Sequence, residues 1–326
     1  MKRIGLFFGG PNNEHEVSIS SAVNVAKNID KEKYEILLIF WDKNGEFYVV
    51  PDINNLEAGE ELKIEDFKNV FDIALLMTHG KYGEDGTLQA ILESQRLSYT
   101  GCHVLSSALC FDKAFFKDFI SGYGISQAKY VAIDYILNNA ADIKEKIDSI
   151  QTFKLPVFVK PANSGSSVGV TRLDDFDGLD KAIEKARKHD HKIVAEEGFT
   201  NHKEIELAVL GNNELVVPDP GEIIVPSGNF YDYDEKYNLG CVEIKIPAKI
   251  SANEIKQAKK LAQKMYGLCG CSGFARVDMF VQNGEVYMSE INTLPGFTDI
   301  SMYPKLMIYG GISYKDLISQ IIELVY

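Results

Sequence analysis

The sequence lacks the cysteine pairs, the long apolar runs and the excess of basic residues that mark several large classes of protein. Its five cysteines include no Cys-x-x-Cys pair, so we expect neither a disulfide framework nor a zinc site, and a reducing cytoplasm fits better. No apolar run approaches the roughly 18 residues that a membrane-spanning helix needs. The net charge of −13 argues against a general nucleic-acid binder, which needs a basic surface.

Two nucleotide-binding fingerprints are also missing. Gly9-Gly10 follows the first predicted strand, but the full Gly-x-Gly-x-x-Gly pattern is absent, which argues against an NAD-dependent oxidoreductase. The Gly-Ser loop around Ser166 is no P-loop, because Gly-x-x-x-x-Gly-Lys-Ser does not occur. Glu14 stands at a predicted helix entrance, where it would repel a pyrophosphate but suit a ligand with an ammonium group.

The chain of 326 residues, 45% hydrophobic and 25% charged, has ordinary globular composition and room for two or three domains. Strand and helix alternate over the first hundred residues, which predicts an open α/β sheet. One helical stretch, 106–124, follows, then a small α+β region, and strands are expected to dominate from Glu196 to a terminal helix. We predict an N-terminal α/β domain over 1–102, a central domain over 103–194 and a C-terminal domain over 195–326.

A hairpin is predicted where two β-rich runs, 274–281 and 285–292, flank the turn signal Asn283-Gly284. The runs carry Asp278, Glu290 and Asn292, and the last two face the same side because they are two residues apart. Oxygen ligands without His or Cys suit Mg²⁺, which also takes phosphate oxygens. The alternative is an ordinary solvated strand face.

Other candidate ligand residues lie at predicted strand ends and on a helix. Lys160 ends a strand and precedes the Gly-Ser loop, whose N–H and hydroxyl groups could fold over phosphates. Lys113 is a second candidate phosphate cation, and His79 ends a strand before Gly80. The alternatives are a plain loop, a solvated lysine and a structural histidine.

Together these segments resemble the D-alanine–D-alanine ligase family of the ATP-grasp fold, from end to end. The matching segments are GGPNNEHEVSISSA, HGKYGEDGTLQ, YTGCHVLSSALCFDK, VKPANSGSSVGV, GEI…FYDYDEKY, ARVDMF and EINTLPGFTDISMYP. The resemblance implies that ATP phosphorylates the carboxylate of a first D-alanine and that the amine of a second D-alanine attacks the acylphosphate. It also implies two Mg²⁺ ions, with Mn²⁺ possible, a homodimer, and a cytoplasmic role in making peptidoglycan precursors.

The resemblance assigns a nucleotide and metal side. It implies that Lys113 and Lys160 contact the α- and β-phosphates, Lys236 the γ-phosphate, Glu196 the adenine and Glu204 the ribose. Asp278, Glu290 and Asn292 resemble the ligands of the two Mg²⁺ ions.

The resemblance also assigns an amino-acid side. It implies that Glu14 holds the ammonium group of the first D-alanine, with His79 near its carboxylate, and that Ser301 holds the carboxylate of the second. Arg276 and the N–H of Gly296 would stabilise the tetrahedral oxyanion. Ser166 and Tyr237 would bond with Glu14 and close two loops over the site.

The second substrate is the least determined feature. The segment containing Tyr237 also resembles that of ligases that add D-serine, and D-lactate is a further alternative. Met302 follows Ser301, where resistance-type ligases often carry Arg, and an apolar Met could border a methyl-sized pocket. We therefore expect D-alanine to be preferred over D-serine by roughly tenfold, since a lost hydrogen bond has a modest effect. A nucleotide-binding protein without ligase turnover is a rival of another class, and the intact amino-acid side argues against it.

Overall fold

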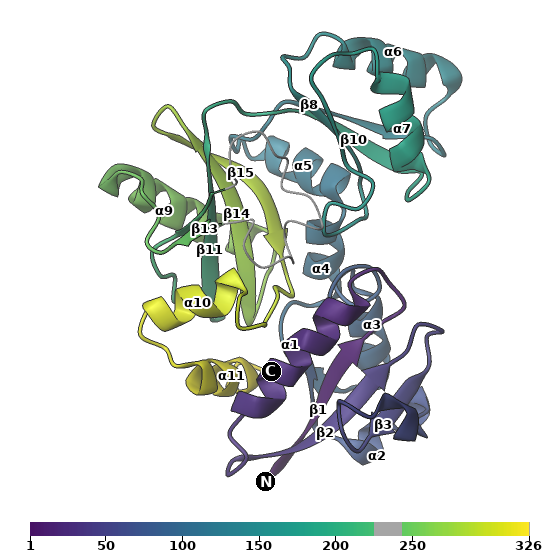
Figure 1. Cartoon of the computed structure of the whole chain (residues 1–326), viewed down its shortest axis with the longest axis vertical. Coiled ribbons are helices and arrows are strands. Elements are labelled where there is room, and N and C mark those ends of the chain that lie inside the picture. The colour runs from purple at the N-terminus through teal and green to yellow at the C-terminus, as the bar shows by residue number, and fades with distance from the viewer. Residues whose placement is uncertain (225–242, 326) are drawn as a thin grey trace.

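The computed structural model describes residues 1–224 and 243–325, which contain three β-sheets (Figure 1). A six-stranded and a four-stranded sheet lie towards opposite ends of the long axis, and a five-stranded sheet lies beside the middle (Figure 1). No helix among the described residues is long and apolar enough to cross a lipid bilayer.

The six-stranded sheet, in the order β4-β3-β2-β1-β5-β6, confirms the predicted open α/β sheet. Parallel pairs join β1 to β2 and β5, and β5 to β6. Because β1 is covered on both faces, Ile4 to Gly9 are all buried. The elements are β1 (Lys2–Gly9), α1 (His15–Asn28), β2 (Tyr34–Trp41), β3 (Phe47–Val50), β4 (Glu60–Glu61), α2 (Phe67–Val70), β5 (Ile73–Leu76), α3 (Thr87–Ser94), β6 (Ser98–Tyr99), and 3₁₀ turns at Leu56–Ala58 and Ile64–Asp66.

The four-stranded antiparallel sheet has the order β7-β10-β8-β9. Its outer face packs on α6 and α7, while α5 lies on the side that faces the rest of the molecule (Figure 1). The elements are α4 (Val104–Phe111), α5 (Lys113–Gly122), β7 (Tyr130–Asp134), α6 (Ala140–Ile150), β8 (Val157–Pro161), β9 (Thr171–Leu173), α7 (Leu179–Arg187) and β10 (Lys192–Glu197).

The single helix expected over 106–124 is wrong, because α4 and α5 are separate helices. Asp112 between them has an extended backbone, with φ −78° and ψ 101°. Its carboxylate accepts hydrogen bonds from Ala114 N and Phe115 N, so it caps α5. The capping residue therefore begins a new helix inside the expected one.

The five-stranded antiparallel sheet has the order β13-β12-β11-β14-β15. One face packs on α9, and α10 and α11 join this region to the core of the six-stranded sheet. The elements are β11 (Lys203–Leu210), β12 (Gly221–Ile224), β13 (Glu243–Lys245), α9 (Ala252–Leu268), β14 (Phe274–Gln282), β15 (Glu285–Asn292), α10 (Met302–Tyr309) and α11 (Tyr314–Glu323).

The expectation that strands dominate until a terminal helix is also wrong, because it missed the 17 residues of α9. The signal was present in the sequence. Ser251 and Glu254 form a capping box, in which Glu254 N donates to Ser251 Oγ and Ser251 N to Glu254 Oε2. Ala258, Ala262 and Met265 then recur at helical spacing and are buried against the sheet.

Candidate active site

Residues from the regions around all three sheets meet at the candidate site. Lys113 at the start of α5 reaches Glu290 of β15, with 3.4 Å between Nζ and Oε2. Glu14, just before α1, lies beside Gly165 of the loop that follows β8. The structure therefore brings together sequence-predicted residues that are far apart in the chain. Lys236 and Tyr237 lie outside the described residues.

On the nucleotide side, Glu196 near the end of β10 is held between two lysines. Lys160 Nζ lies 2.8 Å from its Oε2, and Lys117 Nζ lies 3.1 Å from its Oε1. Burial alone would raise the pKa of Glu196, but the charges of Lys117 and Lys160 lower it to about 2. Glu196 therefore stays ionised and offers a fixed acceptor.

Lys117 was missed by sequence reasoning. Its side chain is only 4% exposed, and burial lowers its pKa although Glu196 favours the charged form. The available signal was its position four residues after Lys113, which places both lysines on the same face of a helix.

Lys113 connects the nucleotide side to the hairpin. Its Nζ donates to Ser164 O at 2.9 Å and pairs with Glu290. Burial opposes its charge, but Glu290, together with Glu84 and Glu196, outweighs that effect and the pKa of Lys113 is raised. The site thus concentrates positive charge where the resemblance expects phosphates.

The predicted hairpin is confirmed. Its turn has positive φ at both central residues, 53° at Asn283 and 83° at Gly284, as a tight two-residue hairpin requires. The register pairs Asp278 with Glu290 and Arg276 with Asn292. Asn292 Nδ2 donates to Asp278 Oδ2 at 2.9 Å. The three predicted metal ligands therefore lie at adjoining positions of two paired strands.

Arg276 lies among acidic groups on this face. Its Nε and one terminal nitrogen each donate to Asp278 at 2.7 Å, and Nε lies 3.0 Å from Glu206 Oε2. Burial opposes its charge, but Asp278 and Glu206 raise the pKa of Arg276 well above its ordinary value. Arg276 therefore neutralises carboxylates of the hairpin and of β11.

The donor set fits a hard cation that shares its ligands with phosphate. Among residues 1–224 and 243–325, no three His, Cys, Asp or Glu side chains are grouped closely enough to hold a metal by themselves. Two carboxylates and an amide oxygen on one strand pair match a cation that keeps other oxygens in its coordination sphere, as Mg²⁺ does.

On the amino-acid side, Glu14 is enclosed by two glycines from different loops. A Cβ at Gly80 would lie 2.6 Å from Glu14 Oε1, and a Cβ at Gly165 only 2.1 Å. Side chains at these positions would therefore displace Glu14. Ser166 and Ser167, next in the loop, both have positive φ, 49° and 59°. The serine loop therefore lies beside Glu14, and the expected bonds of Ser166 and Tyr237 with Glu14 stay a prediction.

Glu84 is a second acidic residue here and was missed. Its carboxylate accepts hydrogen bonds from Gly80 N at 3.2 Å and Leu294 N at 3.5 Å. Burial and the charge of Glu14 raise its pKa to about 8, so Glu84 is largely protonated at neutral pH. The signal was the pair of carboxylates, Glu84 and Asp85, between the two glycines of GEDG.

His79 bridges three segments rather than standing open. Its Nδ1 lies 2.8 Å from Leu294 O, which can only accept, so Nδ1 carries the proton. Its Nε2 therefore accepts from Ser21 Oγ at 2.8 Å, and Ser21 Oγ accepts from Phe297 N at 3.1 Å. Burial and the charge of Arg276 lower the pKa of His79 to about 4. His79 is thus neutral and fixes the loop after β15.

That loop carries Gly296 and Ser301. Ser301 Oγ accepts from Thr298 N at 3.1 Å, lies 2.8 Å from Thr298 Oγ1, and sits beside Gly296. Met302 is 5% exposed and its sulfur packs against Gly221. Met302 is thus a core residue, and its expected place beside a methyl-sized pocket stays a prediction.

Glu204 lies further along the same sheet, in register with Phe280. His202 Nε2 lies 3.3 Å from Glu204 Oε1. Phe199 contacts Phe280 and Tyr287 in an aromatic cluster that sequence reasoning missed. The signal was Phe280 two residues after Asp278, which places both on one face of β14.

Comparisons with known proteins agree over the whole chain. The family models described as D-ala D-ala ligase N-terminus and D-ala D-ala ligase C-terminus match residues 3–102 and 119–323. A D-alanine–D-alanine ligase of Clostridium novyi is 41% identical, covering 99% of this chain and 97% of that protein. D-alanine–D-alanine ligase B of Clostridium tetani is 44% identical, covering 99% and 93%.

Solved structures give the same result. The VanG D-Ala:D-Ser ligase of Enterococcus faecalis has a TM-score of 0.88 at 36% identity and covers 99% of both chains. A D-alanine–D-alanine ligase of Bacillus anthracis complexed with ATP has a TM-score of 0.78 at 30% identity, covering 99% of this chain and 97% of that one. These likenesses confirm the predicted ATP-grasp fold. The chain belongs to the D-alanine–D-alanine ligase family.

Proposed function

We propose that this chain joins two D-alanines to D-alanyl-D-alanine, using ATP and passing through D-alanyl phosphate, for peptidoglycan precursor synthesis. One observation carries the proposal: the same loop after β8 meets both halves of the site. Its Gly165 lies against Glu14, and its Ser164 accepts from Lys113, which pairs with Glu290. The residues proposed as ammonium acceptor and as phosphate cation are therefore joined by one loop.

In the first step, the carboxylate of the first D-alanine attacks the γ-phosphate of ATP, and ADP leaves. Both reactants are anionic, so cations must bring them together. We propose Lys113 and Lys160 for the α- and β-phosphates and Lys236 for the γ-phosphate. Glu14 receives the ammonium group. His79 acts through the loop that it fixes, and its direct contact with the substrate carboxylate remains part of the proposal.

In the second step, the neutral amine of the second D-alanine attacks the acylphosphate carbon, and phosphate leaves. Negative charge develops on the carbonyl oxygen, and Arg276 with the Gly296 N–H would stabilise it. Ser301 would bind the carboxylate of the second D-alanine. Ser166 and Tyr237, bonded with Glu14, would close loops that exclude water from the acylphosphate.

We propose that Asp278, Glu290 and Asn292 hold two Mg²⁺ ions, with Mn²⁺ as a possible substitute. When bound, the ions would neutralise phosphate charge. Glu196 would accept from the adenine amino group and Glu204 would contact the ribose, with the base beside Phe280. We further propose cytoplasmic location and a homodimer, as the resemblance implies.

D-serine as second substrate is the rival that an observation favours, because a D-Ala:D-Ser ligase shares this fold at a TM-score of 0.88. Measuring ADP release with D-alanine alone, and with D-serine or D-lactate added, tests both proposals. We expect ADP release that depends on D-alanine. ATP turnover without any need for D-alanine would overturn the ligase proposal, and faster dipeptide formation with D-serine would change the second substrate.

A further inference from the structure

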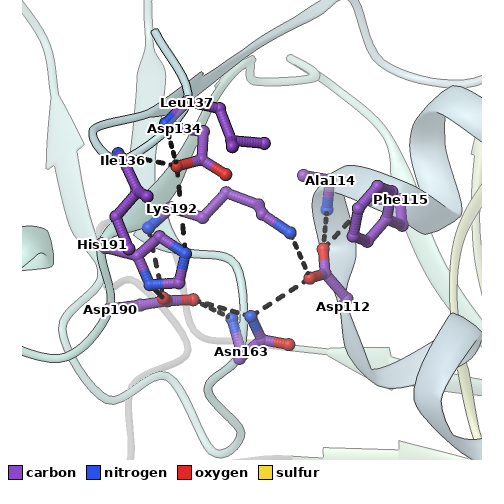
Figure 2. A network of polar contacts seen from close by, with 10 residues as sticks. All are labelled: Asp112, Ala114, Phe115, Asp134, Ile136, Leu137, Asn163, Asp190, His191 and Lys192. Atoms are coloured by element: carbon purple, nitrogen blue, oxygen red, sulfur yellow. Dashed lines mark hydrogen bonds and ion pairs between the residues drawn. The ribbon is translucent and has the colours of Figure 1, made fainter.

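A buried polar network joins the start of α5 to the end of β8 and the start of β10 (Figure 2). Asp112 is at its centre. One carboxylate oxygen caps α5 by accepting from Ala114 N and Phe115 N at 3.0 Å each. The other accepts from Lys192 Nζ at 2.7 Å and from Asn163 Nδ2 at 3.1 Å. Three segments of the chain therefore share one carboxylate.

A second carboxylate closes the network from the other side (Figure 2). Asp190 Oδ2 accepts from both the backbone N and Nδ2 of Asn163, at 2.9 and 2.8 Å. Its Oδ1 accepts from Lys192 N at 3.2 Å and pairs with His191 Nδ1 at 3.1 Å. Asn163 is thus held through its side chain and its backbone, which fixes where the serine loop begins.

Each of the three residues Asp112, Asn163 and Lys192 lies close in sequence to a residue of the nucleotide side. Asp112 immediately precedes Lys113, Asn163 follows Lys160 by three residues, and Lys192 precedes Glu196 by four in β10. The backbone repeats the connection, since Lys113 N donates to Ala162 O and Ala162 N donates to Lys192 O. A shift of the network would therefore move Lys113 relative to Lys160.

Apolar packing does little to prevent such a shift. The buried apolar residues between α5 and the sheet are Ala114, Ala162 and Val194, which offer small surfaces, and Tyr130 and Ala132 are only partly buried there. The opposite face of the same sheet has a far larger core with α6 and α7. The placement of α5 against this sheet thus depends on the polar network, whose Lys192 and Asp112 side chains are only 11% and 10% exposed, whereas Phe116 and Ile120 of α5 pack into the core of the five-stranded sheet.

We propose that Asp112, Asn163 and Lys192 are positioning residues for the triphosphate, which hold Lys113 at a fixed separation from Lys160. The proposal rests on the proposed function, because it gives these lysines phosphates to bind. The network acts through Lys113 and the serine loop and does not itself contact the reacting groups.

The test replaces Lys192 by Met, which keeps the length of the side chain and removes its charge. The matched control is Lys129→Met. Lys129 flanks the same sheet, pairs with Glu197 at 3.7 Å and lies 4.4 Å from the Phe153 ring centroid, as Lys192 lies 3.8 Å from that of Phe115. Calorimetry measures the Kd of a non-hydrolysable ATP analogue with Mg²⁺ and the Kd of adenosine. Steady-state assays measure the KM of ATP and the KM of D-alanine.

We expect Lys192→Met to raise the Kd of the ATP analogue and the KM of ATP by about tenfold, while the Kd of adenosine and the KM of D-alanine change by less than about twofold. Lys129→Met should leave all four values near wild type. Equal loss of adenosine and ATP-analogue affinity would show a merely structural role and overturn the proposal, as would equal behaviour of the two variants.

A second variant tests the same proposal in case Lys192→Met does not fold. Asp112→Asn keeps an oxygen to cap α5 but removes the partner charge of Lys192, and it should show the same selective loss for the triphosphate. Thermal unfolding confirms that each variant is folded in the assay. If wild type binds the ATP analogue but shows no D-alanine-dependent ADP release, the proposed function fails while the calorimetric comparison still decides the positioning role.

Discussion

Glu84 and Glu196 are both deeply buried carboxylates, yet their surroundings move their pKa values in opposite directions. Around Glu196, burial is outweighed by Lys117 and Lys160, and its pKa falls to about 2. Around Glu84, burial is reinforced by the charge of Glu14, and its pKa rises to about 8. Burial is common to both, so the sign of the neighbouring charge decides the outcome.

The difference separates the two sides of the site. The nucleotide side gathers lysines and holds one ionised carboxylate between them, which suits an anionic triphosphate. The amino-acid side places Glu14 beside a largely protonated Glu84, so that Glu84 adds little negative charge where we propose that an ammonium group binds. We therefore expect that removing a carboxylate charge changes stability and turnover differently on the two sides.

The largest effect is expected from Glu196→Gln, which leaves Lys117 and Lys160 facing each other without a counter-ion. Breaking a buried pair in this way should lower the free energy of unfolding by about 3 kcal/mol. Glu197→Gln is the matched control, because its partner Lys129 is 55% exposed and the change should be below about 1 kcal/mol. Urea unfolding at neutral pH measures both.

The pH dependence of this effect has a definite sign. Because folding lowers the pKa of Glu196 from 4.5 to about 2, its contribution to stability is present above the ordinary value and is lost as pH falls towards 2. Equal stability of the Glu196→Gln and Glu197→Gln variants at neutral pH would show that the lysines do not hold this carboxylate.

The next largest effect is expected from Glu290→Gln. This change removes a charge at the boundary between the two sides and alters the side-chain volume little. It removes one carboxylate of the proposed metal ligands, which is also the partner of Lys113. We therefore expect kcat to fall at least about tenfold, which corresponds to about 1.4 kcal/mol in activation free energy. The measurement is phosphate release over a range of Mg²⁺ concentrations. Near-normal turnover at low Mg²⁺ would contradict the metal assignment.

The parts of the site that sequence predicted are those specified by local patterns. Asn283-Gly284 and the alternation on both sides of it predicted the hairpin, and with it the juxtaposition of Asp278 and Glu290. Lys117, Glu84 and the helix break at Asp112 were not predicted. Their significance comes from partners distant in sequence: Asp112 bonds Lys192 eighty residues away, and Glu84 bonds Leu294 N. The long helix α9 was an avoidable miss, since its capping box is local.

The choice of second substrate comes next, and it concerns the amino-acid side alone. We expect kcat/KM for D-alanine to exceed that for D-serine by roughly tenfold, because a buried Met302 offers a hydroxyl no strong hydrogen bond. We expect little ester formation with D-lactate at neutral pH. Competition between the second substrates at one pH measures the preference, and equal use of D-serine would place this chain with the D-Ala:D-Ser ligase that it resembles.

The smallest expected effect is a pH dependence that belongs to Glu84. Because folding raises its pKa from 4.5 to about 8, its protonated form contributes stability that is fully present below the ordinary value and is lost as pH rises through about 8. Between about pH 7 and about pH 9 the loss should be on the order of 1 kcal/mol.

Glu84→Gln keeps an uncharged acceptor beside Gly80 N, so its unfolding free energy should change less over this range than that of wild type. Asp85→Asn, one residue further on in the same loop, is the control and should keep the wild-type slope. If wild type and Glu84→Gln lose stability in parallel from neutral to alkaline pH, then Glu84 does not have the raised pKa that distinguishes it from Glu196.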